Sequence, residues 1–461
     1  MQPLSRSPRA LLRRVLPTIA LALALAALAP PELASQGPVP APSLPSAASG
    51  DWGEPGVFLL TMGQGDMVWE RFGHDAIWIH DPVAGTDQVY NYGMFDFRSP
   101  GYWRRFMKGN WIYQVGAVDL GRTLAEYQYL NRSVWAQELN LTPAQKREVQ
   151  AFLEWNVRPE NREYLYDYYR DNCSTRIRDV IDRAAGGRLK AATAGRPTGT
   201  TFRWHSERLV EGDRLVYFGL LGGLGPAADR PIDQWEEMFL PGKVREQVRR
   251  VRVPDASGRM VPLVKAEHTL FAAAGRAPEA AEPPSWLPWY LLAGLALGGA
   301  LAGLGALARR SAAARVGLAA LGGSWSLVGG VGGIILLGLW TLTNHRIAYR
   351  NENLLQFDPL ALGLVVLVPA AAFGARWAAR PARMLALAVA ALSVLGLVMQ
   401  ALPGLDQVNG TMIAFTLPVH LGLAWAVARN GGGQGTGDRG QPATAGKSGA
   451  RNRGVPAGPQ G

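Results

Sequence analysis

The 461-residue sequence contains a single cysteine, Cys173, so no disulfide can form within one chain. It also lacks the Cys-x-x-Cys and His-Glu-x-x-His spacings that are typical of zinc sites. Four candidate ligands, His74, Asp75, His80 and Asp81, lie close together in the chain but without such spacing, so a catalytic metal is the weaker interpretation. No metal or other cofactor is expected.

The net charge of +11 does not predict a nucleic-acid partner. Much of the positive excess lies in an N-terminal arginine cluster, beside the apolar segments of the second half and in the C-terminal tail. Membrane topology accounts for basic residues in such places.

The near-zero mean hydropathy conceals a polar, aromatic half and an apolar half. Four arginines before residue 15, an apolar core at 15–29 and small residues at 34–35 resemble an export signal, with an uncleaved anchor as the alternative. No cysteine lies directly after that core, so the chain itself is not expected to be a lipoprotein. The predicted parts are a signal peptide or signal anchor at 1–35, a linker at 36–50, a soluble domain at 51–280, a transmembrane domain at 286–429 and a disordered cytoplasmic tail at 430–461.

Five apolar spans are long enough to cross a hydrocarbon core, which takes roughly 20 residues. They lie near 286–308, 316–342, 358–376, 384–402 and 411–428. Arginines gather after the first span, between the third and fourth, and after the fifth. The positive-inside rule makes these ends cytoplasmic, so the soluble domain lies outside, in agreement with the export signal.

The soluble half begins with β structure. Alternating apolar segments separated by turns predict strands at 56–61, 72–80 and 88–95. Residues 98–160 are expected to be mostly helical.

Cys173 follows an aromatic run and the pair Asp171-Asn172, which is typical of a helix start. Apolar residues at Ile177, Val180 and Ile181 then recur at helical spacing. The first turn of a helix favours a thiolate, and its free N–H groups can hold an oxyanion. The alternative is a lone cysteine that only fills space in the core.

His74 precedes Cys173 by 99 residues and begins an apolar strand. A strand histidine opposite a helix-start cysteine is the arrangement of cysteine hydrolases and acyltransferases, in which a third polar group orients the imidazole. Asn91, on the neighbouring strand, is the preferred third residue. The other candidates for orienting the imidazole or holding an oxyanion are Asp75, His80, Asp96, Asn172 and Ser174.

Segments 72–82, 89–97 and 171–179 resemble the periplasmic domain of the Lnb family of bacterial lipoprotein N-acyltransferases. The first and third are also similar, more distantly, to permuted papain-like folds of the NlpC and lecithin:retinol acyltransferase type. The Lnb resemblance extends through 139–142, 159–162, 229–231 and 237–241 and into the apolar half at His345 and 351–355. It implies an α+β permuted papain-like periplasmic domain followed by an all-α five-helix transmembrane bundle, in the bacterial inner membrane.

The resemblance implies that Cys173 and His74 are catalytic, with Asn91 as the third member. It implies a phospholipid as acyl donor and a diacylglyceryl-cysteine lipoprotein as acceptor. Between the two steps, the acyl group is carried on Cys173 as a thioester. One alternative keeps the Cys–His site but makes it a hydrolase of lipid esters or peptidoglycan peptides. Another is a non-enzymatic envelope sensor or scaffold, whose function alkylation of Cys173 would leave intact.

Residues 343–353 join the second and third spans on the outer side and are rich in polar groups. Arginine can grip a phosphate bidentately, so this loop is a candidate for lipid headgroup binding. The alternative is a loop that only caps two spans. The headgroup candidates are His345, Arg350, Asn351, Asn353 and, in the soluble domain, Arg203.

Overall fold

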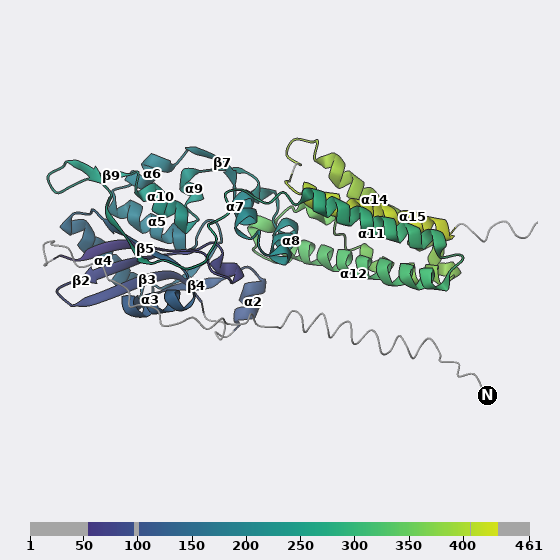
Figure 1. Cartoon of the computed structure of the whole chain (residues 1–461), viewed down its shortest axis with the longest axis horizontal. Coiled ribbons are helices and arrows are strands. Elements are labelled where there is room, and N and C mark those ends of the chain that lie inside the picture. The colour runs from purple at the N-terminus through teal and green to yellow at the C-terminus, as the bar shows by residue number, and fades with distance from the viewer. Residues whose placement is uncertain (1–53, 96–100, 406, 432–461) are drawn as a thin grey trace, which may run out of the picture. The chain divides into compact units, whose positions relative to one another are not determined.

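The computed structural model describes residues 54–95, 101–405 and 407–431, which form a mixed α/β domain and a helical region (Figure 1). The predicted signal segment at 1–35, the linker at 36–50 and almost all of the tail at 430–461 lie outside the described residues. The candidate Asp96 lies outside them as well. The predicted domain boundaries therefore remain predictions.

The first domain is built on a seven-stranded antiparallel sheet in the order β11-β5-β1-β2-β3-β4-β6. The strands predicted around 56–95 are confirmed as β1, β2 and β3. The bounds are β1 Gly56–Met62, β2 His74–Asp81, β3 Thr86–Met94, β4 Ile112–Asp119, β5 Val134–Leu139, β6 Glu163–Leu165 and β11 Val264–Phe271. Two small hairpin sheets join β7 Pro197–Thr201 to β8 Pro231–Asp233 and β9 Arg252–Pro254 to β10 Met260–Pro262.

The prediction of a mostly helical stretch at 98–160 is wrong in two places, where β4 and β5 lie. β5 pairs with β1 on one side and β11 on the other, and Val134, Ala136 and Leu139 are buried. Its partners are distant in the chain, so tertiary pairing overrides the helix-forming tendency of Ala, Gln, Glu and Leu.

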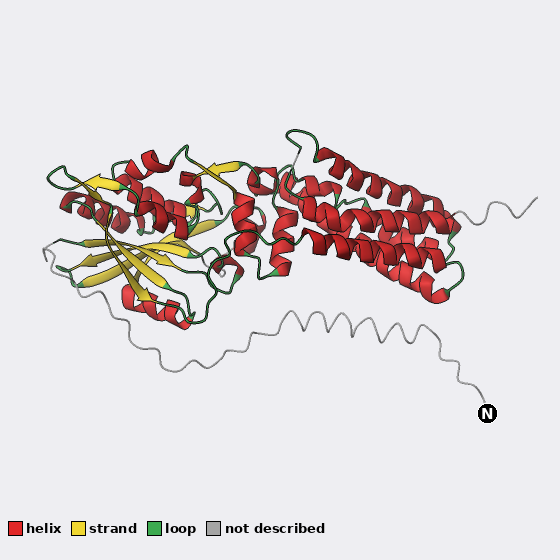
Figure 2. Cartoon of the chain, turned by 45° about the horizontal axis from the view of Figure 1, so that its top comes forward, coloured by secondary structure: helices red, strands yellow, loops and turns green. Residues whose placement is uncertain are grey.

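Helices cover both faces of the sheet, so side chains of β1 are buried in both directions (Figure 2). Val57 and Leu59 pack with helices α4, α5 and α10, whereas Phe58 and Leu60 pack with α3. The helices of this domain are α2 Tyr102–Met107, α3 Leu120–Tyr129, α4 Pro143–Asn156, α5 Cys173–Ala184, α6 Arg188–Thr193, α7 Phe202–Leu209, α8 Arg214–Gly223, α9 Gln234–Glu237 and α10 Pro241–Val248, with short 3-10 turns η1 Val68–Glu70 and η2 Pro226–Ala228.

The second half contains four helices long and apolar enough to cross a membrane, within the described residues. They are α11 Leu287–Leu307, α12 Ala312–Leu342, α14 Arg376–Met399 and α15 Gly410–Gly431. The predicted span at 358–376 instead holds α13 Ala361–Ala372, with only 12 residues. Five full-length helices are therefore not confirmed.

The segment before α13 accounts for its shortness. Two 3-10 turns, η3 Arg346–Ala348 and η4 Glu352–Leu355, precede it. Phe357 and Pro359 contact α12 at Gly333, and Leu362 contacts it at Gly330. The chain before α13 therefore runs beside α12 without forming an α-helix. Non-helical backbone is tolerated inside a membrane where protein surrounds it.

Glycines set the close approach of α11 and α15. A Cβ on Gly298 of α11 would lie 2.2 Å from the carbonyl oxygen of Pro418 on α15. A Cβ on the neighbouring Gly299 would meet nothing within 4 Å. Small residues at such contacts let helix backbones pack closely in a membrane.

We predict that Gly298→Val lowers the free energy of unfolding by about 1–3 kcal/mol, because backbone atoms of α15 cannot yield to the new side chain. Gly299→Val is the matched control and should leave stability unchanged. The measurement is the thermal unfolding midpoint of both full-length variants in detergent. Equal midpoints would contradict the close packing of α11 on α15.

Candidate active site

The start of α5 is held by its N-cap residue, Asn172. The Asn172 side chain accepts a hydrogen bond from the Thr175 N–H at 2.9 Å and donates to the carbonyls of Tyr168 and Phe239, both at 2.9 Å. Asn172 is buried, and its amide is fully used in capping. The structure therefore gives it a capping contact in place of the oxyanion contact considered from the sequence.

The buried carboxyl group of Asp75 ties the first turn of α5 to strand β2. It accepts hydrogen bonds from the hydroxyls of Thr61 and Ser174, both at 2.9 Å. Asp75 follows His74 directly, and Ser174 follows Cys173. The Asp75–Ser174 bond thus holds the histidine segment against the cysteine segment, and it occupies the Ser174 hydroxyl.

Glycines let the backbone reach this arrangement. Gly73 has φ +78°, and a Cβ there would lie 2.9 Å from the Met62 carbonyl oxygen. On β3, Gly93 has φ +89°, and a Cβ there would lie 3.4 Å from the Cys173 Cβ. A positive φ is accessible to glycine at little cost.

His74 and Asn91 meet across the sheet, as the sequence interpretation preferred. β3 pairs with β2 so that Asn91 lies opposite Ala76, and the His74 Nε2 to Asn91 Oδ1 distance is 3.2 Å. When Nε2–H donates to Asn91, Nδ1 carries the lone pair and can accept a proton.

Cys173, His74 and Asn91 line one cavity of about 790 Å³. This volume lies in the range of about 300–1,000 Å³ that is usual for small-molecule sites. Its walls are mainly aromatic and apolar. They include Tyr92, Phe95, Tyr102, Trp103, Phe106, Trp111, Tyr113, Tyr127, Tyr166, Tyr168, Val216, Leu220, Leu224 and Ile347.

Burial makes the resting pair neutral. It raises the pKa of the Cys173 thiol to about 12, and the nearby Asp75 carboxyl acts in the same direction. Main-chain N–H groups of Asp75, Ser174 and Cys173 favour the thiolate but do not outweigh the loss of water. Burial, with Arg132 adding to it, also lowers the pKa of His74 to about 4. The partial charge of the helix start, which was expected to favour a thiolate, is here opposed by the apolar and aromatic surroundings of the thiol.

His80 does not join this group. It lies six residues beyond His74 on β2, about 20 Å away at the strand rise of roughly 3.3 Å per residue. Its Nδ1 is 2.9 Å from Asp87 Oδ1, and Trp78 Nε1 donates to the same oxygen at 2.7 Å. The structure gives His80 this separate polar contact.

Three of the predicted headgroup residues lie in a buried polar joint between the two halves. Asn351 Nδ2 donates to the Gly222 carbonyl at 2.7 Å, and Asn353 Nδ2 donates to the Leu221 carbonyl at 2.9 Å. Arg203 Nε pairs with Asp229 at 2.5 Å. Each of the three is at most 2% exposed.

The joint continues into the loop before α15. Gln407 Nε2 donates to the Leu224 carbonyl at 3.0 Å and to Asn351 Oδ1 at 3.1 Å. Asp229 also accepts the Val408 N–H at 3.2 Å. These contacts fix the end of α8 to the membrane half and occupy donors that a headgroup would need.

The other two headgroup candidates are more accessible. Arg350 is exposed and has φ +56°, and His345 is partly buried. The His345 ring packs edge-on against Trp111, with centroids 5.5 Å apart. A headgroup role for these two residues remains a prediction.

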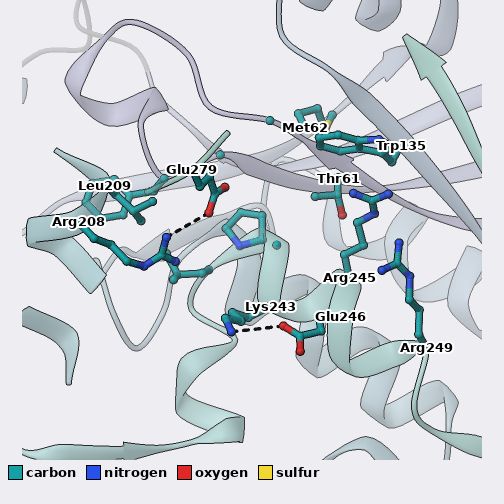
Figure 3. Close-up of a pocket in the computed structure, with 16 residues that line it drawn as sticks. Thr61, Met62, Trp135, Arg208, Leu209, Lys243, Arg245, Glu246, Arg249 and Glu279 are labelled. Atoms are coloured by element: carbon teal, nitrogen blue, oxygen red, sulfur yellow. Dashed lines mark hydrogen bonds and ion pairs between the residues drawn. The ribbon is translucent and has the colours of Figure 1, made fainter. Parts of the chain in front are cut away.

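A second cavity, of about 480 Å³, holds mostly paired charges (Figure 3). Arg208 is 3.4 Å from Glu279, and Lys243 is 3.3 Å from Glu246. Arg245 and Arg249 both pair with Glu267. None of the candidate catalytic residues lines this cavity.

No cluster of three or more His, Cys, Asp or Glu side chains suited to a metal ion occurs within 54–95, 101–405 and 407–431. Of the four ligands considered from the sequence, Asp75 bonds to hydroxyls, His80 contacts Asp87 and Asp81 caps the turn at Val83 and Ala84.

The sequence interpretation missed two parts of the site. Arg132 lines the cavity, donates to the Gly63 carbonyl at 2.9 Å and lies 3.4 Å from Glu70. Helix α8 supplies one wall, and its Phe218 packs on Tyr290 of α11 with ring centroids 6.0 Å apart. The apolar run 215–221 could have indicated α8, whereas no local pattern marks Arg132.

One comparison with known proteins gives a match. Residues 51–207 match the family model described as the Lnb N-terminal periplasmic domain. No curated protein and no solved structure matches the chain.

We predict that alkylation of Cys173 by iodoacetamide is slow at pH 7 and still accelerates above pH 9, because the raised thiol pKa leaves little thiolate. The rate is followed by mass spectrometry of the intact chain. The same chain in denaturant is the control and should show an ordinary thiol midpoint near about 8.5. A folded-state rate that levels off near neutral pH would contradict the raised pKa of the thiol.

Asp75 gives a prediction for the pH dependence of stability. Burial raises its pKa from 3.8 to about 7, so the folded chain binds this proton more tightly than the unfolded chain. The contribution of this proton to the stability of the folded chain is fully present below pH 3.8 and is lost as the pH rises through about 7. The thermal midpoint of the wild-type chain should therefore fall relative to that of Asp75→Asn between these pH values. Parallel pH profiles would contradict the assignment.

Proposed function

We propose, from the match of residues 51–207 to the Lnb N-terminal periplasmic domain, that the chain transfers an acyl group from a phospholipid to the N-terminal amine of a lipoprotein. A periplasmic domain joined to four candidate membrane helices is consistent with a multi-pass inner-membrane protein that processes lipoproteins. The acyl transfer itself, its residues and its partners are the proposal.

The observation that carries the proposal is that one cavity is lined both by the candidate catalytic residues and by a helix that packs on the membrane helices. The cavity contains Cys173 and His74 and is walled on one side by Val216 and Leu220 of α8. The same helix packs Phe218 against membrane helices α11 and α15. An apolar cavity that adjoins the bundle suits an acyl chain better than a peptidoglycan peptide.

In the first step, the Cys173 sulfur attacks the carbonyl carbon of a phospholipid ester as His74 Nδ1 accepts the thiol proton. General-base transfer at the moment of attack suits a pair that is neutral at rest. The lysophospholipid leaves with a proton returned by His74, and a thioester remains on Cys173.

In the second step, the α-amine of a diacylglyceryl-cysteine attacks the thioester carbonyl. The amide bond forms as the carbon–sulfur bond breaks, and the proton lost by the amine passes through His74 to the sulfur. Asn91 holds the imidazole so that one ring nitrogen faces the reacting sulfur in both steps. The free main-chain N–H groups at the start of α5 support an oxyanion during each attack.

The candidate headgroup residues His345 and Arg350 stay in the proposal as contacts of the donor lipid. In the proposal, Arg203, Asn351 and Asn353 do not contact the lipid. They hold α8 in place, and α8 forms one wall of the cavity.

The test is mass spectrometry of the N-terminal peptide of a reporter lipoprotein, made in cells that lack other N-acylation activity. The wild-type chain should add a third acyl chain, whereas Cys173→Ala should add none. Asn91→Ala should reduce the product by roughly one hundredfold, within the range for a mispositioned general base. His80→Ala is the matched histidine control and should retain activity.

Three outcomes would overturn the proposal. A product from both the wild-type and Cys173→Ala chains would remove the thioester step. No product from well-expressed wild-type protein would favour the hydrolase, provided that purified protein releases fatty acid from lipid esters. Function that survives alkylation of Cys173 would favour the sensor or scaffold.

A further inference from the structure

Helix α2 exposes two large apolar side chains. Trp103 is 62% exposed and Met107 is 70% exposed. The helix is anchored by Phe106, which stacks on Trp111 with ring centroids 4.7 Å apart. Large apolar side chains grouped on an exposed rim are typical of a surface that meets another apolar phase.

The end of α2 is fastened to the loop that follows membrane helix α12. The Asn344 N–H donates to the Lys108 carbonyl at 2.8 Å, and Asn344 Nδ2 donates to Asn110 Oδ1 at 2.6 Å. Between them, a Cβ on Gly109 would lie 2.9 Å from the His345 nitrogen. Helix α2 therefore lies beside the point where α12 ends.

The length of α12 gives the height of that point. Its 31 residues span about 46 Å at roughly 1.5 Å per residue. A bilayer with its headgroup layers is about 40–45 Å thick. For a helix of this length that crosses the bilayer, we expect the last turn of α12 in the headgroup layer nearest the periplasmic domain.

Exposed tryptophans lie near both ends of the membrane helices. Trp289 of α11 and Trp340 of α12 are 64% and 41% exposed near the ends that adjoin the periplasmic domain. Trp377 and Trp425 are exposed near the opposite ends, close to Arg376 and Arg429. Tryptophan collects at both membrane interfaces, so the first pair sets the level beside which α2 lies.

Helix α2 also lines the catalytic cavity. Trp103 and Phe106 form part of its wall, and Val216 and Leu220 of α8 form another part. The exposed edge of α8 carries Leu215, which is 81% exposed. An apolar rim formed by α2 and α8 thus borders the cavity that contains Cys173.

Basic side chains accompany this rim. Two exposed basic residues, Arg104 and Lys108, belong to α2 and the residue after it. Two more, Arg346 and Arg350, belong to the loop that follows α12. Near a membrane surface, such basic side chains are attracted to anionic lipid headgroups.

We propose that α2 rests in the headgroup layer of the membrane and that the cavity opens between α2 and α8, forming a lateral portal through which a lipid acyl chain reaches Cys173. The occupant of the exposed apolar rim is the lipid bilayer. The portal part rests on the proposed acyl transfer, whereas the membrane contact of α2 does not.

The membrane contact is tested by the depth of a nitroxide on a single cysteine. Met107→Cys is made in the Cys173→Ser chain and reconstituted in vesicles of phosphatidylcholine and phosphatidylglycerol. Val83→Cys is the control, because Val83 is 79% exposed in the turn between β2 and β3. The label at 107 should collide more with oxygen than with a water-soluble nickel chelate, and the label at 83 should do the reverse. A water-like label at 107 would overturn the proposal even if the chain proves to be an acyltransferase.

The portal is tested with Leu215→Glu, which places a charge on the apolar rim of the proposed opening without changing a residue of the cavity wall, and with Val83→Glu as its control. Acylation of Cys173 by vesicle phospholipid should fall by at least about tenfold in Leu215→Glu, equivalent to about 1.4 kcal/mol. Reaction with a water-soluble short-chain ester should stay near the wild-type rate. Unchanged phospholipid acylation, or an equal loss with both esters, would overturn the portal.

A wild-type chain that reacts with neither ester would instead contradict the proposed function and, with it, the portal. The depth measurement would still decide whether α2 lies in the membrane.

Discussion

The hydrogen bond between the side chains of Asp75 and Ser174, 2.9 Å long, is the contact on which the candidate site depends. Asp75 directly follows His74 and Ser174 directly follows Cys173, the two candidate catalytic residues, so this bond joins strand β2 to the first turn of α5. The central place of β2 in the sheet and the Asn172 cap make both sides of this contact rigid. Distant segments of the chain thereby meet with little freedom, which is what a nucleophile and its base require.

The cavity that would accommodate an acyl chain also determines the chemistry of the pair. Its apolar and aromatic walls raise the pKa of the thiol and lower that of the imidazole, despite the helix N-terminus. In the proposed mechanism, the thiol proton therefore moves during the attack itself. Apolar walls around the proposed thioester would also slow its hydrolysis until an amine arrives.

Much of this arrangement could be predicted from local sequence patterns. The strands around 56–95, the capped helix at Cys173 and the position of Asn91 opposite the histidine strand follow from alternation, turns and capping. β5 and β11 could not be predicted in the same way, because each gains its stability from strands far away in the chain. The short α13 was also missed, because hydropathy measures apolar length and not the point where a helix begins.

Polar residues in the outer loop show a further limit of sequence patterns. Asn351 and Asn353 looked like headgroup contacts because they lie between apolar spans. Their partners are main-chain carbonyls at the end of α8, and a pattern of residue types does not reveal such partners. The neighbouring Gln407 and Asn409, also buried and polar, belong to the same network. Four buried amides near one level favour an internal joint over a lipid contact.

The measurement that tests the account most directly is the mass of the chain itself after incubation with phospholipid vesicles and no acceptor. The account predicts one added acyl group on the peptide that contains Cys173, released by neutral hydroxylamine and absent from Cys173→Ser. An acyl group on another residue, or an unmodified wild-type chain that still acylates a lipoprotein, would contradict it.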